Sequence, residues 1–206
     1  MDIKDFYVSP LGRAKATAKY TLDKMGRYAT ECEWLKEFPI RINKPNEDSS
    51  VAWDWLPEDW TSINEFFDFE KWKATPIMKE SGVAAEYDRV CSELDKLIAR
   101  YGYIRDGRKY VTAEGNDDTI VLFCHFGLES VLLSHLLNIS PMVIWHGTCA
   151  LTSSVTTLVT EERRKGIAYF RMNSFSDTSH LYIGGEEPSF SARFCETYEN
   201  SEQRHD

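Results

Sequence analysis

Long hydrophobic runs and an excess of basic residues are both missing from this 206-residue sequence. No stretch approaches the ~18 consecutive apolar residues that a membrane-spanning helix requires. Lysine and arginine number 24 against 33 aspartates and glutamates, and the formal net charge of −9 leaves no basic face for a nucleic acid or an anionic membrane. We therefore expect neither a nucleic-acid partner nor a membrane partner.

The cysteines show no pattern of metal ligation or of disulfide pairing. They are odd in number and never spaced as C-x-x-C, so we expect free thiols in a reducing compartment, no zinc site, no other metal and no cofactor. The N-terminal "MDIKDFYVSP" lacks the basic and then apolar pattern of a secretory signal. These features predict a soluble, cytoplasmic protein. The five cysteines are Cys32, Cys91, Cys124, Cys149 and Cys195.

The composition, 42% hydrophobic and 28% charged, predicts one globular domain over residues 1–206. Residues 38–80 differ from the rest, because they are acidic, interrupted by proline and contain Trp53, Trp55, Trp60 and Trp72. We expect an insertion with short helices that covers the sheet like a cap, since so many aromatic side chains need a surface to pack on.

Periodicity predicts alternating strands and helices. The strand over 3–9 leads into a helix bounded by Pro10 and Gly26, and a helix over 82–101 precedes a hairpin turn at Asp106-Gly107. This order predicts a three-layer α/β/α sandwich with a mostly parallel sheet and an antiparallel edge. The remaining predictions are an extended segment over 29–38, a strand over 120–123, a helix over 128–137, a short strand over 141–144, strands over 153–160 and 166–175, and a solvated turn at "ERRKG" (162–166).

Three charged residues follow strands of this predicted sheet. Arg13 lies in the first turn after the first strand, Glu37 ends the second extended segment, and His125 ends the strand "TIVLFCH". An arginine and a histidine near helix N-termini are suited to phosphate, whereas a carboxylate beside them would repel it and is better suited to donating a proton. The alternatives are a surface arginine and a histidine that only makes a structural hydrogen bond.

Three segments resemble the motifs of one family. "YVSPLGRAKATA" (7–18) is similar to the S-P-L-x-R-A-x-x-T-A segment of the histidine phosphatase superfamily, the phosphoglycerate mutase-like proteins. "VLFCHFGLESVLLSHLL" (121–137) resembles its second histidine motif, and "FSDTSHL" (175–181) resembles its C-terminal N-D-T-S-H-L segment. The resemblance implies a phosphoglycerate mutase-like fold and a phosphomonoester phosphatase or phosphotransferase that acts on a small phosphorylated substrate.

The resemblance also implies roles for individual residues. Arg13 and His125 would bind the phosphoryl oxygens, Glu37 would be the general acid/base, and the insertion would select the substrate. Phe126 stands where the family has the first glycine of H-G-G, and its backbone N–H would still point at phosphate. Ser9 and His146 are candidates for the border of the same pocket.

The family's nucleophile is missing, because no R-H-G occurs in the sequence. None of the remaining histidines follows a strand end beside an arginine, so we expect the chain as given to be inactive. A start upstream of Met1 would supply the nucleophile. Loss of the strand that carries it would leave sheet edges unpaired, which favours a homo-oligomer. The remaining histidines are His135, His146, His180 and His205.

Two other functions stay open at this point. The first is a degenerate module that binds a phosphorylated ligand without turnover, although Glu37 would then serve no purpose. The second is a Cys–His hydrolase that uses Cys124 or Cys149. Cys124 and His125 are neighbours on an extended segment, so their side chains point to opposite faces, and there is no G-x-S-x-G elbow.

Overall fold

In the computed structural model, which describes residues 2–45 and 47–189, a parallel sheet joins the first strand to the strand that precedes His125. β1 (Asp5–Val8) lies between β2 (Thr30–Glu31) and β7 (Ile120–Phe123) and pairs in parallel with both. Val8 is the register partner of Phe123. β1 and β7 therefore end together at one edge of the sheet, with no gap between them.

The helix α1 (Gly12–Met25) connects β1 to β2 and ends where the sequence predicts. Gly26 adopts φ 62°, a conformation that favours glycine, and its N–H bonds to the carbonyls of Leu22 and Asp23. Ala14 and Ala18 form the buried face of the helix and pack with Val8. The helix thus starts directly beside the carboxyl end of β1.

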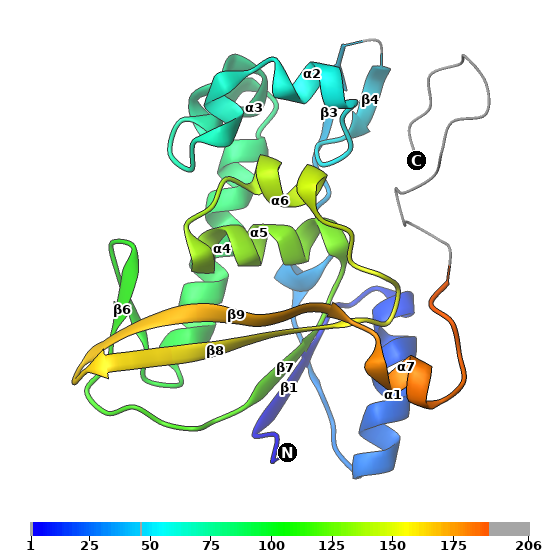
Figure 1. Cartoon of the computed structure of the whole chain (residues 1–206), viewed down its shortest axis with the longest axis vertical. Helices are drawn as coiled ribbons and strands as arrows, with labels where there is room; N and C mark the ends of the chain where they lie inside the picture. Colours follow the sequence, from blue (N-terminus) through cyan, green and yellow to red (C-terminus); the bar gives the residue numbers. More distant parts are fainter. Residues whose placement is uncertain (1, 46, 190–206) are drawn as a thin grey trace.

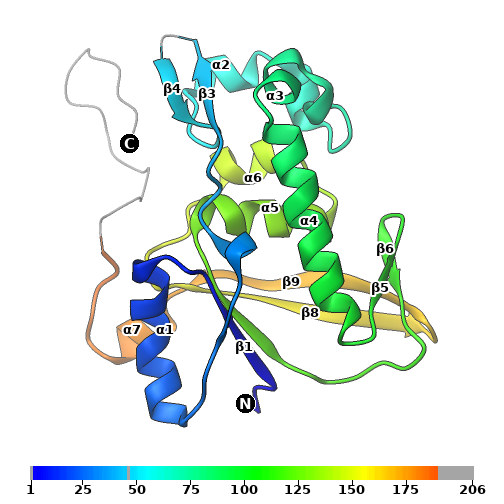
Figure 2. The same cartoon turned by 180° about the vertical axis from the view of Figure 1, so that it is seen from behind.

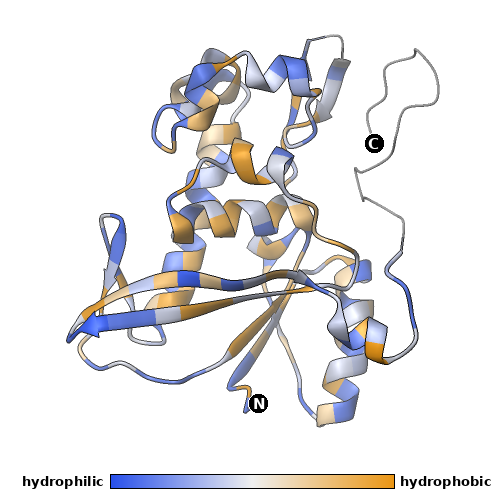
Figure 3. Ribbon diagram, viewed as in Figure 1, coloured by the Kyte–Doolittle hydropathy of each residue, from blue (hydrophilic) through white to orange (hydrophobic). Residues whose placement is uncertain are grey.

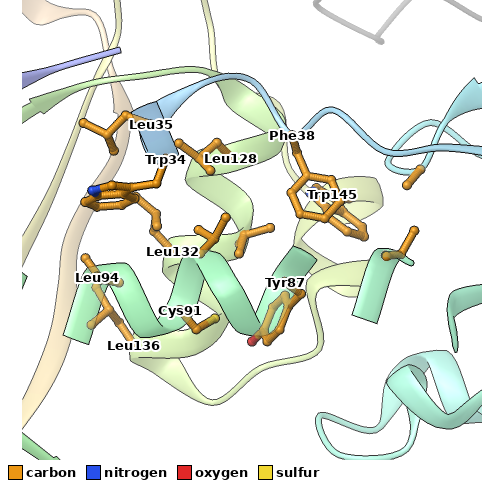
Figure 4. Close-up of a cluster of buried hydrophobic side chains, with 14 of the residues drawn as sticks. Trp34, Leu35, Phe38, Tyr87, Cys91, Leu94, Leu128, Leu132, Leu136 and Trp145 are labelled. Carbon is orange, nitrogen blue, oxygen red and sulfur yellow. The ribbon is translucent and has the colours of Figure 1, made fainter. Parts of the chain in front are cut away.

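The main core lies between α4 (Val83–Ala99), α5 (Phe126–Leu137) and the segment around η1 (Glu33–Leu35). Figure 4 shows Leu128 and Leu132 of α5 facing side chains of α4 and of residues 34–38. The apolar residues of α4 recur at helical spacing, which explains why the sequence predicts this helix within two residues at each end. The buried residues of α4 are Val83, Tyr87, Val90, Cys91, Leu94, Leu97 and Ile98.

Residues 38–80 form short elements at one end of the molecule, at the top of Figure 1. Trp72 is fully buried there and contacts the ring of Tyr87 edge-on at 4.9 Å. Aromatic packing of this kind joins the segment to α4. The elements are β3 (Arg41–Lys44), β4 (Glu47–Val51), α2 (Pro57–Thr61), η2 (Asn64–Phe67), η3 (Trp72–Ala74) and α3 (Pro76–Glu80).

Among the described residues, four antiparallel strands form a sheet in the order β5-β6-β9-β8, and β3 pairs with β4 in a separate antiparallel hairpin. The Asp106-Gly107 turn joins β5 (Ile104–Asp106) to β6 (Lys109–Val111), as predicted. The long hairpin of β8 (Val155–Arg164) and β9 (Ile167–Asp177) crosses the parallel strands, in front of them in Figure 1 and behind them in Figure 2. The expected α/β fold, with a parallel sheet and antiparallel strands, is confirmed.

Two local predictions were wrong, and a third, the extended segment over 29–38, is confirmed only for the strand β2 that pairs with β1. Residues 141–144 belong to a helix, α6 (Pro141–Gly147), because Pro141 starts it and Met142 and Trp145 bury one face at i, i+3 spacing. Residues 161–164 continue β8 as its hydrophilic end (Figure 3), so the turn is shorter than "ERRKG" and contains Gly166 at φ 84°. Residues 29–38 contain only a two-residue strand before η1.

The C-terminal described element is α7 (Ser179–Ile183), which contains His180. His205 and Cys195 lie outside the described residues. Among the helices formed by residues 2–45 and 47–189, none has the length and hydrophobicity to cross a bilayer.

A hydrogen-bonded tyrosine pair, with Tyr7 buried and Tyr101 partly buried, joins β1 to the residues just after α4, and we expect it to stabilise the fold. The Tyr101 hydroxyl donates to Asp5 Oδ2 at 2.6 Å and lies 2.6 Å from the Tyr7 hydroxyl. Tyr101→Phe removes both hydrogen bonds and should lower the free energy of unfolding by about 1–3 kcal/mol, measured by urea denaturation. Tyr28→Phe, at a side chain that is 93% exposed, is the control and should change nothing. Equal stability of the two variants would contradict this assignment.

Candidate functional site

Ser9 and His125 meet at the carboxyl edge of the parallel sheet. Ser9 follows β1 and donates its backbone N–H to the carbonyl of Phe123, the last residue of β7. The chain then turns through Cys124 to His125, which is the N-cap of α5. His125 is only 9% exposed, and its Nε2 lies 2.8 Å from the Ser9 hydroxyl oxygen. Two predicted pocket residues from distant parts of the sequence are therefore in direct contact.

Arg13 contacts the same histidine from the first turn of α1. Its Nε–H donates to Nδ1 of His125 at 3.0 Å. An arginine can only donate, so Nδ1 is unprotonated, and the proton of the neutral ring is on Nε2, which donates to Ser9. Burial, aided by the charge of Arg13, lowers the pKa of His125 to about 4. At neutral pH the pair is thus one exposed guanidinium beside one uncharged imidazole.

Glu37, which follows η1, is held against the first turn of α5. Its Oε1 accepts the backbone N–H of Phe38 at 2.9 Å and of Leu128 at 3.1 Å. Burial raises the pKa of this carboxyl, while the backbone hydrogen bonds and the charge of Arg13 act in the opposite direction. Burial has the larger effect, so Glu37 keeps its proton to a higher pH than an ordinary glutamate does.

The beginning of α5 is covered by an aromatic pair. Phe126 is the first residue of the helix, and its ring meets that of Trp53 edge-to-face at 5.9 Å and 84°. Trp53 belongs to the insertion, so residues 38–80 reach the site at this point. The predicted pocket residue Phe126 therefore brings both a helix-terminal backbone and an aromatic wall to the edge where Arg13 and His125 meet.

His146 has a different environment from the other predicted residues. Its Nδ1–H donates to the Met142 carbonyl at 2.7 Å, its Nε2 accepts the Trp55 N–H at 3.1 Å, and its ring stacks on Trp60 at 5.0 Å. Burial lowers its pKa to about 4. Both ring nitrogens are engaged by backbone groups, whereas the ring nitrogens of His125 bond to the side chains of Arg13 and Ser9. His146 thus joins α6 to the insertion.

Sequence reasoning did not identify Trp53 or Glu129 as site residues. Glu129 lies in the first turn of α5, where burial and the charge of Glu37 raise its pKa, and a hydrogen bond from Thr156 of β8 partly offsets this. An acidic residue four positions after His125 was a usable signal, because one helical turn places it at the same helix end. No sequence signal pairs Trp53 with Phe126, because that contact depends on how the insertion folds.

The cysteine beside His125 is not arranged as a nucleophile. Burial, and then the charges of Glu129 and Glu37, raise the pKa of the Cys124 thiol far above its usual value. Nucleophilic cysteines require the opposite, a lowered pKa. No group of three or more histidine, cysteine or acidic side chains could hold a metal ion within the described ranges.

Comparisons with known proteins identify the family. The sequence profile of the "Histidine phosphatase superfamily (branch 1)" matches residues 1–173. No curated protein matches the chain.

Three solved structures share the fold at low sequence identity. Phosphoserine phosphatase from Entamoeba histolytica in complex with 3-phosphoglyceric acid is 19% identical, with a TM-score of 0.54 over 87% of this chain and 76% of that one. A histidine-to-alanine mutant of the same enzyme in complex with phosphoserine is 18% identical, with a TM-score of 0.52 over 86% of this chain and 76% of that one. A structure described as mycobacterial hydrolase 1 is 18% identical, with a TM-score of 0.52 over 85% of this chain and 77% of that one. With the profile match over most of its length, the chain belongs to the histidine phosphatase superfamily, branch 1.

Proposed function

We propose that this chain binds the phosphoryl group of a small phosphomonoester at Arg13 and His125 and that Glu37 is the general acid of phosphoryl transfer. The observation that supports this most directly is the hydrogen bond between Arg13 and His125 at the shared end of β1 and β7. Glu37 is hydrogen-bonded to the first turn of α5, the helix whose N-cap is His125.

Each group has a distinct task in this proposal. The exposed guanidinium of Arg13 supplies two parallel N–H donors to phosphate oxygens. Phosphate would take over the place of Nδ1 as acceptor for Arg13, and its charge would raise the pKa of His125, which then binds as an imidazolium. The first backbone N–H groups of α5, that of Phe126 included, favour an anion at the helix N-terminus. Ser9 keeps the imidazole in position through its hydroxyl.

Glu37 is suited to protonating the leaving group rather than to binding phosphate. A carboxylate would repel the phosphoryl group, whereas a carboxyl whose pKa is raised by burial is better suited than an ordinary glutamate to supply the proton that an alkoxide needs when the P–O bond breaks. The electron pair of that bond stays on the alcohol oxygen, which takes the proton of Glu37. A complete transfer also requires a nucleophile that forms the new bond to phosphorus, and His125 does not supply it in this arrangement.

His125 itself lacks a free lone pair in this arrangement. Nδ1 accepts from Arg13, and Nε2 carries the proton that is donated to Ser9. This observation favours the second candidate function, a phosphate-binding module without turnover, for the 206 residues alone. The two candidates share the binding step and differ only in whether a nucleophile reaches the phosphorus atom.

A turnover assay separates these candidates. The 206-residue chain should bind vanadate and phosphate in calorimetric titrations but should hydrolyse p-nitrophenyl phosphate at the background rate, because both nitrogens of His125 are engaged and the sequence has no R-H-G nucleophile. Absence of vanadate binding would refute the proposed function. Robust hydrolysis that disappears in His146→Ala or His180→Ala would show that one of these histidines is the nucleophile.

A further inference from the structure

Trp53 and Glu37 come together over a position where the chain has no side chain. A Cβ atom on Gly127 would lie 2.6 Å from Nε1 of Trp53 and 2.8 Å from Oε1 of Glu37. Both distances are far below van der Waals contact. The indole edge and the carboxyl group therefore both lie against the backbone of Gly127, in the first turn of α5, where a larger residue would leave no room for them.

The segment that carries Trp53 is anchored on both sides of it. The preceding residue, Ala52, is fully buried and accepts the indole N–H of Trp55 at 3.0 Å. The backbone N–H of Trp55 donates to His146 of α6. Phe126 then contacts the Trp53 ring from the helix side. The indole is thus held over Glu37 by the folded insertion and not by its own rotamer alone.

From this geometry we propose that Trp53 is a positioning residue that acts through Glu37: its indole keeps water from the carboxyl group. This inference rests on the proposed function in treating Glu37 as the general acid, and it adds the insertion as the element that controls this acid. With Trp53 in place, the carboxyl of Glu37 is shielded from water, which disfavours a negative charge beside the phosphate site. With Trp53 displaced, water reaches Glu37, the pKa of its carboxyl falls toward the ordinary value, and the negative form that repels a phosphoryl group is favoured.

The electrostatics of the surrounding groups agree with this assignment. Burial is the largest influence on Glu37 and the one that raises its pKa, while the N–H groups of Phe38, Gly127 and Leu128 and the charge of Arg13 lower it. The other titratable groups that interact with Glu37 are Glu129 of α5 and the Cys124 thiol at the end of β7. Removal of the indole takes away part of this burial, so the pKa of Glu37 should fall.

The coupling must also act in reverse. If Trp53 favours the protonated form of Glu37, then ionisation of Glu37 must loosen Trp53 by the same free energy. Proton loss after transfer to the leaving group would therefore loosen the contact between the insertion and α5. This links the protonation state of the acid to the position of the insertion.

The experiment follows the ¹³C carboxyl resonance of Glu37 by NMR as a function of pH in the full 206-residue chain. Trp53→Ala should lower the pKa of Glu37 by about one unit, since partial loss of desolvation produces shifts of this order. Trp53→Phe keeps most of the cover and should give a smaller shift of the same sign. Trp60→Phe, which changes another tryptophan of the insertion, should leave the resonance unchanged.

A second pair of variants tests the same contact from the helix side. Gly127→Ala must displace the indole or the carboxyl and should also lower the pKa of Glu37, whereas Gly12→Ala has open space around its new methyl group and should not. At a pH between the Glu37 pKa values measured for the wild type and for Trp53→Ala, the variant should bind vanadate more weakly, and this loss should vanish in a Glu37→Gln background. A purely structural tryptophan would weaken binding equally in both backgrounds.

The outcomes separate the inference from the function on which it rests. An unchanged Glu37 titration in folded Trp53→Ala overturns the role of Trp53 even if vanadate binds. If Trp53→Ala does not fold, an unchanged titration in both Trp53→Phe and Gly127→Ala overturns it equally. If the wild-type chain binds no vanadate, the proposed function fails, and the titrations still decide whether Trp53 controls Glu37.

Discussion

Replacing Arg13 with alanine should weaken vanadate and phosphate binding by about 100-fold or more. Two charge-assisted hydrogen bonds are lost, each of which contributes about 1.5–3 kcal/mol, and about 1.4 kcal/mol corresponds to a tenfold change in affinity. Arg13 is exposed and its described side-chain hydrogen bond is to His125, so its removal leaves the buried core intact. Isothermal titration calorimetry at constant pH and ionic strength measures the effect.

Three further variants test whether the loss of binding comes from the phosphate-binding role of Arg13. Arg13→Lys keeps the charge but not the planar fork, so it should fall between the wild type and Arg13→Ala. Lys19→Ala removes an exposed cation from the same helix, where it pairs with Asp23, and should bind like the wild type. Glu37→Gln is neutral at every pH and cannot repel the anion, so it should bind as tightly as the wild type or more tightly. If Glu37→Gln weakened binding more than Arg13→Ala, the two roles would be reversed.

The stability of the fold should fall steeply between pH 6.5 and pH 4. Burial lowers the pKa of both His125 and His146 to about 4, against 6.5 for an ordinary histidine. In this interval the unfolded chain binds protons that the folded chain excludes, so stability is full above pH 6.5 and declines as the pH falls. Each histidine contributes a loss of about 3 kcal/mol over the whole interval. Urea denaturation at closely spaced pH values measures this slope.

The contribution of His146 can be isolated by difference. His146→Gln should be less stable than the wild type at pH 7, because its two hydrogen bonds to backbone groups are disturbed, and this deficit should shrink or reverse at pH 4. Glu37 and Glu129 act in the opposite sense, because their raised pKa values give stability that is lost as the pH rises. They are present in both proteins and cancel in the difference. His180→Gln, at an exposed position of α7, is the control. A deficit that does not change with pH would contradict the assignment.

Local signals predict most of the parallel sheet and its helices. The helix α1 ends at Gly26 because glycine adopts the left-handed conformation most easily there, and this depends on neighbouring residues alone. The helix α6 was missed because a short apolar run fits a strand and a helix equally well until packing decides. In the fold, Met142 and Trp145 need a common buried face, and a helix provides it.

The sequence by itself determined the family, the α/β fold and the positions of Arg13, His125 and Glu37 near the ends of their elements, because strand ends, helix starts and motifs are local properties. Only the tertiary structure decided how these groups act on one another. The parallel pairing of β1 with β7 places Ser9 and Arg13 on the two nitrogens of His125, which selects the tautomer. The fold of the insertion places Trp53 against Gly127 beside Glu37. It also places the backbone N–H of Trp55 where it donates to Nε2 of His146. These contacts join residues distant in the chain, so their existence depends on packing that no local pattern contains.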